Sequence, residues 1–367
     1  MQRVLVTVAV FALVFAALLI GTLAAHWPFW QRAWQWQSAT EGWPAQLSGP
    51  ALALQPSATP LPLHVLADAR LAARATVGST DIVMVGDATG RVAAWFAPGN
   101  DVYSVVDGRG MTAGLLGPLY GALIADRHAS LLDVPVGATI DEWRGRTRGV
   151  MTPRQLLWQL SGLSAGAFVP LNPWSRRAQL ASGPDFYRAA LHTPLAYPPG
   201  SHFEPAAANA QLLALLAERI DRSSFAQVLQ QRLWSRFAGQ PAIGMLDHPR
   251  GNLAAHCCLR AAAEDWLRLG LLIAADGRSG TVRVLPAGYV AQMTASSPVH
   301  PGYGFGYRLG GSTGANRLIL ETNGRRMSIA PHTGRAVLWV GRGAPPSWLD
   351  ALLSPGEFAW QDTTGIE

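Results

Sequence analysis

The residues best placed for chemistry form a short turn, Gly108-Arg109-Gly110-Met111-Thr112-Ala113. A run that reads as a strand, 102–106, precedes the turn, and a run rich in Leu and Ala follows it to about Arg127. Backbone N–H groups at the start of a helix lack intrahelical partners, so such a turn can bind an anion or stabilise negative charge in a reaction. The pattern makes residues 108–127 the centre of a candidate site.

The glycines of this turn also satisfy a dinucleotide-binding pattern, Gly108-x-Gly110-x-x-Ala113. That pattern needs a second strand that ends in Asp or Glu about 20 residues later. Asp126 instead falls at the end of the expected helix, and the chain shows no other alternation of strand and helix. We therefore expect no nucleotide and no other cofactor.

Arginine carries all of the basic charge, because none of the 367 residues is lysine. This excludes a Schiff base, a P-loop lysine and a lysine general base. The net charge of +6 and the pI of about 9.9 raise the question of a nucleic acid or an anionic membrane surface. The arginines are scattered, however, and their longest runs are the pairs Arg176-Arg177 and Arg325-Arg326. We therefore expect no nucleic-acid partner.

The N-terminus predicts a transmembrane helix. The 22 residues of segment 4–25 carry no charge, which is long enough to cross a bilayer and longer than the roughly 7–15 apolar residues of a signal peptide. Residues 1–30 are thus a membrane anchor or a signal sequence that could be cut after Leu23-Ala24-Ala25, and we favour the uncleaved anchor. Five aromatic residues that follow suit the outer membrane–water interface: Trp27, Phe29, Trp30, Trp34 and Trp36.

The charge of Arg3 and of the α-amino group keeps the N-terminus inside the cell. We therefore expect a single-pass protein of the inner (cytoplasmic) membrane, with its folded domain in the periplasm or outside the cell. Residues 31–62, rich in Pro, Ser, Ala and Gln, predict a linker, and residues 63–360 predict the domain.

The domain predicts an α+β fold with one antiparallel sheet flanked by helices. A hairpin, 81–85 and 91–96, stands near its start. Further strands are expected at 303–307, 317–320, 326–329 and 336–340. Helices are expected at 152–157, 187–191, 207–220, 225–237, 261–273 and 348–353. Strands at both ends and helices between them indicate a helical subdomain, about 110–270, inserted into the sheet.

Several runs in order carry a family resemblance: Ala97-Pro98-Gly99-Asn100-Asp101, the turn at 108–113, 152–163, Pro199-Gly200-Ser201-His202-Phe203, 262–272, Leu285-Pro286 and Tyr303-Gly304-Phe305-Gly306. Together they resemble serine hydrolases related to 6-aminohexanoate-dimer hydrolase, in the class C β-lactamase-like and penicillin-binding-protein superfamily. The resemblance spans about residues 80–342 and implies a β-lactamase/transpeptidase-like fold.

The chemistry that the resemblance implies is missing from this chain. The family route uses a nucleophilic Ser, a Lys three residues later and a Tyr from the helical subdomain. These fall on Gly110, Ala113 and Pro205, and a later G-H-x-G-Q motif retains Gly324 alone. Glycine has no side chain, and alanine and proline cannot move a proton, so no acyl-enzyme can form by this route. We predict that these four positions are vestigial and that none is catalytic.

Polar residues near the family's motif positions are candidates for ligand binding: Asn209, Thr322 and Asn323. The main hypothesis is an inactive serine-hydrolase homologue that is tethered in the cell envelope and binds a peptide, a cell-wall fragment or a protein partner. The alternatives are an active hydrolase of amides or esters with another nucleophile, such as Ser104 beside Asp107, and a structural envelope protein. Ser161 and Ser164 read as structural.

The helix after the turn should itself be altered. Gly110, Gly114, Gly117 and Gly121 share one helical face, and Pro118 falls among them. Proline inside a helix kinks it or marks its true start. We expect a close-packed or re-bent segment where the catalytic centre of the family would lie.

The two cysteines, Cys257 and Cys258, are adjacent. Consecutive Cα atoms are about 3.8 Å apart, less than the usual disulfide span of about 4.4–6.8 Å. This spacing favours two buried thiols over a bridge. His248 and His256 lie close by but lack a usual ligand spacing, so we expect no metal site.

Overall fold

The computed structural model describes residues 2–37, 50–76, 79–125, 129–164, 166–169, 171–311, 317–356 and 358–360. Its main sheet has the strand order β10-β11-β12-β13-β3-β4-β2. The strands are β2 His64–Ala67, β3 Thr80–Asp87, β4 Arg91–Phe96, β10 Arg308–Gly310, β11 Arg317–Thr322, β12 Arg325–Ala330 and β13 Arg335–Gly341. All neighbours are antiparallel except β2 and β4. Because β13 pairs with β3, strands from both ends of the domain meet at the centre of the sheet, as predicted.

Both faces of the central strand β13 are covered. Leu338 and Val340 face the large core, where α11 (Ala263–Ala274) packs against the sheet. Val337 and Trp339 face a second core formed with α3 (Ala69–Ala75) and the 3-10 helix η8 (Leu349–Leu353). Alternate side chains of a strand point to opposite faces. Two-sided cover therefore explains why all seven residues of β13 are buried.

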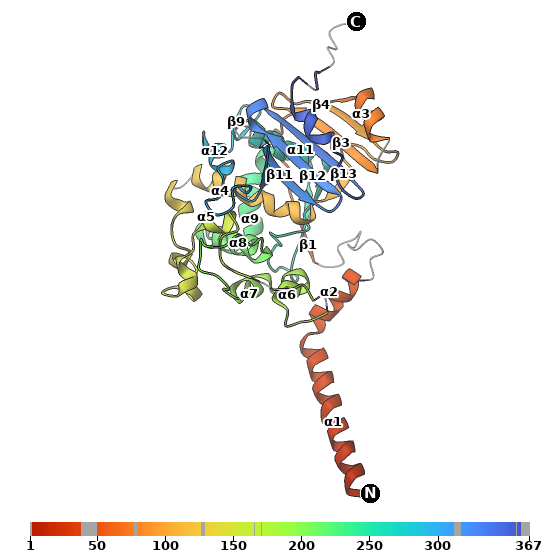
Figure 1. Cartoon of the computed structure of the whole chain (residues 1–367), viewed down its shortest axis with the longest axis vertical. Helices are drawn as coiled ribbons and strands as arrows, with labels where there is room; N and C mark the ends of the chain where they lie inside the picture. Colours follow the sequence, from red (N-terminus) through yellow and green to blue (C-terminus); the bar gives the residue numbers. More distant parts are fainter. Residues whose placement is uncertain are drawn as a thin grey trace.

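The helical subdomain lies on one side of the sheet, between it and α1 (Figure 1). Its α-helices are α4 Leu116–Ala125, α5 Pro153–Leu157, α6 Arg176–Ser182, α7 Phe186–Leu191, α8 Ala207–Asp221, α9 Phe225–Leu229 and α10 Ser235–Phe237, and α12 Tyr289–Met293 follows later in the chain. A π-helical turn, η6 (Gln230–Trp234), joins α9 to α10. The short 3-10 helices are η1 Arg109–Leu115, η2 Ala129–Leu132, η3 Val136–Ala138, η4 Asp141–Trp143, η5 Thr147–Val150 and η7 Pro331–Thr333.

The start of α5 follows local sequence rules. Thr152 Oγ1 accepts a hydrogen bond from the backbone N–H of Gln155, and the Gln155 side chain accepts one from the backbone N–H of Thr152. Pro153 occupies the first helical position, where no N–H partner is needed. The predicted helix start is confirmed.

A second, smaller sheet was not expected. It has the order β1-β6-β7-β5, with β1 Ala51–Leu54, β5 Val105–Asp107, β6 Ala242–Met245 and β7 Arg260–Ala262. The strand before the turn is β5, so it belongs here and not to the main sheet. Strands of three or four residues give too little periodicity to assign a sheet. The strand expected at 303–307 is wrong as well, since this stretch makes a single bridge, Tyr303 to Arg308. A short hairpin completes the list: β8 Arg278–Ser279 and β9 Val282–Arg283.

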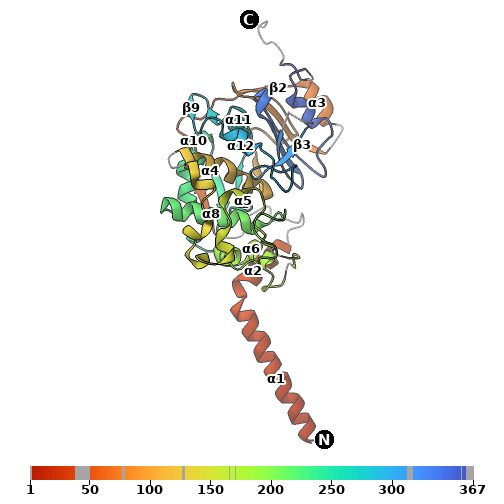
Figure 2. The same cartoon turned by 60° about the vertical axis from the view of Figure 1, so that its left-hand side comes forward.

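Helix α1 (Gln2–Ala25) projects away from the domain (Figures 1 and 2). Its segment Thr7–Ala25 is long and apolar enough to cross a membrane, by length and composition. The next helix, α2 (Trp27–Gln37), contacts α6. Phe29 and Ala33 of α2 pack against Ala178 of α6.

Arg32 of α2 reaches into the domain and donates to the carbonyl oxygens of Gly183 at 3.1 Å, Leu246 at 3.0 Å and Asp247. The expected linker, 31–62, is therefore corrected in part: it contains the end of α2 and the strand β1. Residues 38–49 of that linker, and the side chains of Trp34 and Trp36, lie outside the described part.

Candidate active site

The turn at Gly108 joins β5 to η1 and is fixed from one side by residues 258–259. Gly108 N–H donates to the Leu259 carbonyl at 2.8 Å, and Leu259 N–H donates to Thr112 Oγ1 at 3.1 Å. A Cβ atom on Gly108 would overlap the ring of Trp266, which explains the glycine. These contacts fix the turn within the fold and hold its backbone close to α11.

Gly110 lies beside the hairpin that joins β11 to β12. It is exposed, and a Cβ atom on it would stand 3.7 Å from Thr322 Oγ1. Gly324 has φ +73° in the two-residue turn of this hairpin, a conformation that favours glycine, and a Cβ there would overlap the Gly341 carbonyl. The structure therefore brings Gly110 next to Thr322. The backbone geometry of the hairpin turn also explains why residue 324 is a glycine.

Two guanidinium groups converge on Asn323 at this edge. Arg109 Nη1 donates to its carbonyl oxygen at 3.3 Å and Arg325 Nη1 at 3.4 Å. The backbone N–H of Arg109 is in turn held by Asp107 Oδ1 at 2.9 Å. Arg109 is buried, at 9% exposure, and Arg325 is half-buried, so the two groups hold the Asn323 turn and carry positive charge close to Gly110. Sequence reasoning missed both arginines. The position of Arg109 between two glycines of the turn was the sequence signal that could have indicated it.

The segment after the turn is not one continuous α-helix. η1 continues to Leu115 and the α-helix begins at Leu116, so Pro118 is its third residue. A proline at this position removes an N–H that has no intrahelical partner. Pro118 lies in the first turn of α4, so the prediction that it stands at the start of the helix is confirmed to within two residues. Ala113 lies in η1, half-buried, with its carbonyl oxygen facing Gly306.

The close packing expected along the glycine face is confirmed from Gly114 onward, and is wrong at the exposed Gly110. The Gly114 carbonyl accepts from Tyr307 Oη at 2.8 Å, and the Gly117 carbonyl accepts from Tyr289 Oη at 2.9 Å. Burial raises the pKa of both phenols well above their usual range. They therefore remain protonated donors and cannot replace the missing tyrosine as a base.

Pro205 and Asn209 are organised around Gln159. Its carbonyl oxygen accepts from Glu204 N–H at 3.0 Å, and its Oε1 accepts from Ala206 N–H at 3.0 Å and from Asn209 Nδ2 at 2.8 Å. Pro205 is exposed, whereas Asn209 is fully buried. Asn209 Oδ1 has no hydrogen-bond partner among the described residues. Asn209 thus lies inside the protein, whereas Thr322 is half-buried and Asn323 is exposed.

The serines considered as alternatives serve local structure. Ser104 Oγ accepts from Asp101 N–H at 2.8 Å and donates to Asp101 Oδ1 at 3.2 Å, so it makes a turn and no pair with Asp107. Ser161 Oγ accepts from Leu163 N–H at 3.1 Å, and Ser164 Oγ from Gly166 N–H at 3.4 Å.

Cys257 and Cys258 form a disulfide, with Cα atoms 3.7 Å apart. This corrects the expected thiols: general span statistics disfavour the bridge, but both side chains are buried together in one small cluster. Burial lowers the pKa of the neighbouring His256 to about 4, so its ring is neutral at pH 7. Within the described residues, no group of three His, Cys, Asp or Glu side chains could hold a metal ion.

Comparison with known proteins agrees with this architecture. The family model described as Beta-lactamase matches residues 119–345, more than half of the chain. The chain belongs to the Beta-lactamase family. The matched range begins nine residues after Gly110, so it covers the helices and the C-terminal strands but not the turn. A search of curated proteins found no match.

Solved structures show the same fold at low sequence identity. A Bacillus anthracis protein described as a 6-aminohexanoate-dimer hydrolase has a TM-score of 0.67 and 17% identity, over 89% of this chain and 92% of its own. A D-stereospecific amidohydrolase from Streptomyces sp. has a TM-score of 0.53 and 16% identity, over 78% and 96%. A penicillin binding protein from Bacillus halodurans has 0.52 and 14%, over 72% and 93%. The predicted β-lactamase/transpeptidase-like fold is confirmed.

Proposed function

We propose that this chain is a catalytically inactive member of the Beta-lactamase family that binds a ligand or partner and is held at the outer face of the cytoplasmic membrane by α1. The observation that carries the proposal is the identity of the residues where the family's serine, lysine and tyrosine fall: Gly110, Ala113 and Pro205. None of the three can attack a carbonyl or transfer a proton, so the nucleophile, its activator and the relay are lost together.

The surroundings of Gly110 support this proposal against a hydrolase with another nucleophile. Thr322 supplies the hydroxyl beside a Cβ on Gly110, but no acidic or basic side chain hydrogen-bonds to it among the described residues. An alcohol without an adjacent base is a weak nucleophile. Tyr289 and Tyr307, which donate to the backbone carbonyls of Gly117 and Gly114, keep their protons because burial raises their pKa. They therefore cannot act as the missing base.

The ligand we expect is anionic, such as the carboxylate end of a peptide or of a cell-wall fragment. The half-buried Arg325 and the buried Arg109 supply positive charge beside Gly110, and the half-buried Thr322 and the exposed Asn323 supply polar groups. Asn209 stays a candidate for a ligand that reaches the interior, because its Oδ1 is buried without a partner.

Covalent labelling tests the inactivity. Full-length protein is treated with a fluorophosphonate and with a fluorescent penicillin, beside an active family member as a positive control. We expect no labelling of the natural chain or of Gly110→Ser, because Ala113 and Pro205 still leave the new serine without a base. Stoichiometric labelling of the natural chain would refute the proposal and favour the active-hydrolase alternative.

Thermal-shift measurements with amides and muropeptides test the binding. We expect a carboxylate-bearing ligand to raise the melting temperature of the natural chain and of Arg177→Gln, an exposed control on α6. The rise should be lost in Arg109→Gln and in Arg325→Gln. The absence of any shift with every ligand would favour the structural-protein alternative instead.

A further inference from the structure

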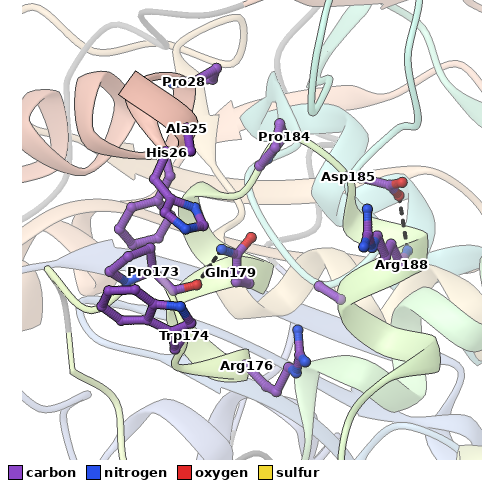
Figure 3. A pocket seen from close by; sticks show the side chains of 12 residues that line it. Ala25, His26, Pro28, Pro173, Trp174, Arg176, Gln179, Pro184, Asp185 and Arg188 are labelled. Carbon is purple, nitrogen blue, oxygen red and sulfur yellow. Dashed lines mark hydrogen bonds between the residues drawn. The ribbon is translucent and has the colours of Figure 1, made fainter. Parts of the chain in front are cut away.

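A cavity of about 360 Å³ lies where α1 meets the folded domain. Three segments line it: the junction of α1 and α2, the start of α6 with the loop before it, and the start of α7. Figure 3 shows His26 and Trp174 on one side of the cavity and Arg188 on the other. The turn at Gly110 contributes nothing to the lining, so this cavity is separate from the candidate active site.

The lining of the cavity is positively charged. Arg176 and Arg188 both line it, and neither guanidinium forms an ion pair with another described residue. Asp185 is the acidic lining residue, and its carboxylate accepts a hydrogen bond from the backbone N–H of Arg188 at 2.9 Å. Two guanidinium groups against one carboxylate leave one positive charge. Arginine forks match the oxygens of a phosphate group.

Large apolar side chains are exposed around the same junction. They are 40–65% exposed: Trp27, Phe168, Val169, Leu171 and Trp174. The ring of Trp174 packs edge-on against His26, with ring centroids 5.5 Å apart, and this contact holds the loop before α6 against the end of α1. Tryptophan is enriched at the boundary between membrane and water, and an apolar patch beside a membrane helix suits contact with lipid.

The predicted membrane segment determines where the cavity lies relative to the bilayer. Ala25 is both the last residue of the segment Thr7–Ala25 and part of the cavity lining. If that segment spans the bilayer, the cavity opens at the level of the lipid headgroups. The docking of α2 through Arg32 holds the domain in this position.

We propose that this cavity binds the phosphate group of an anionic phospholipid, with Arg176 and Arg188 as its ligands and with Trp27 and Trp174 in the headgroup layer. The inference rests on the membrane anchorage proposed above. It adds a lipid site that is independent of any ligand at Gly110. Its consequence is that the domain is oriented by lipid as well as by α1.

Native mass spectrometry of the full-length chain tests the site. The protein is released from nanodiscs of phosphatidylcholine, alone or mixed with phosphatidylglycerol, and the bound lipids are counted. We expect phosphatidylglycerol to be retained. Arg176→Gln and Arg188→Gln should each weaken its binding by about 10-fold or more, since a hydrogen bond to a charged group contributes about 1.5–3 kcal/mol. Arg177→Gln removes the same charge from the adjacent exposed position, which does not line the cavity, and should leave binding unchanged.

Three outcomes would overturn the proposal. Equal retention of phosphatidylcholine and phosphatidylglycerol would show that the site does not select an anionic lipid. If Arg177→Gln weakened phosphatidylglycerol binding as much as Arg176→Gln and Arg188→Gln do, the binding would depend on the overall charge of the surface and not on this cavity. Competition by inorganic phosphate as strong as that by phosphatidylglycerol would assign the site to a soluble anion. Carbonate extraction of membranes reports on the anchor separately. Release of the chain would refute both the anchorage and the lipid site, whereas an integral chain without dependence on Arg176 and Arg188 would refute the lipid site alone.

Discussion

A methyl group added at Gly114 should destabilise the fold, whereas one added at Gly110, on the same glycine face, should not. A Cβ on Gly114 would lie 2.7 Å from Leu320 Cδ2 and closer still to Cδ1, on a side chain that is 5% exposed in β11. A Cβ on Gly110 would meet Thr322 at 3.7 Å, which is ordinary contact, and that position is exposed.

The magnitude follows from two opposing effects. Overpacking a buried site destabilises by about 1–3 kcal/mol, and replacing glycine by alanine in a helix stabilises by up to about 1 kcal/mol. We therefore expect Gly114→Ala to lower the free energy of unfolding by about 1–2 kcal/mol. Gly110→Ala should leave it unchanged or raise it by about 0.4–1 kcal/mol, because alanine restricts the unfolded chain.

Urea unfolding of the full-length chain in detergent, followed by tryptophan fluorescence, measures both values. The background variant Leu320→Ala isolates the cause, because it removes the side chain that a Cβ on Gly114 would overlap. In that background Gly114→Ala should lose its penalty, a coupling of about 1 kcal/mol or more between contacting residues. Equal stability of Gly110→Ala and Gly114→Ala, or an unchanged penalty without Leu320, would refute the packing argument.

Two further predictions concern charge. Burial lowers the pKa of His256 from 6.5 to about 4, so the unfolded chain binds this proton more tightly. His256 should leave stability unaffected above about pH 6.5 and reduce it by about 3 kcal/mol as the pH falls to 4. Urea unfolding measured over a pH series checks this. If the free energy of unfolding of His256→Gln fell between pH 6.5 and 4 as steeply as that of the natural chain, the prediction would be wrong. Arg32→Ala should leave three buried carbonyl groups without their donor, which locally destabilises the docking of α2 by about 2–3 kcal/mol. Hydrogen–deuterium exchange in α2 should then rise well above that of the exposed control Gln31→Ala, and equal exchange in both variants would show that Arg32 does not hold the helix.

Several parts of the fold could be predicted from local sequence. The capping box at Thr152, the hairpin strands β3 and β4 and the first turn of α4 around Pro118 depend on neighbours within a few residues, which a sequence displays directly. The apolar run of β13 could be recognised in the same way, because burial on both faces needs a nearly continuous apolar strand.

Other parts could not be predicted because they depend on residues far apart in the chain. Arg32 bonds to carbonyls more than 150 positions away, and β5 pairs with β7 across a similar distance. The Pro, Ser and Gln content of segment 31–62 predicted a linker, yet the half-buried Arg32 and the apolar contacts of α2 dock its first part on the domain. The cavity beside Ala25 exists because residues 25–29 meet residues 173–189, which lie far away in the sequence.

The sequence by itself determined which chemistry is unavailable at the turn. Glycine, alanine and proline lack reactive groups in any fold, so the positions Gly110, Ala113 and Pro205 needed no coordinates to be judged. The tertiary structure decided what surrounds them: Gly110 is exposed, two protonated tyrosines bond to the backbone at Gly114 and Gly117, and the guanidinium groups of Arg109 and Arg325 bond to the Asn323 carbonyl. The reason is physical. A side chain's functional groups are fixed by its covalent structure, whereas burial, pKa and packing are set by neighbours that folding brings together.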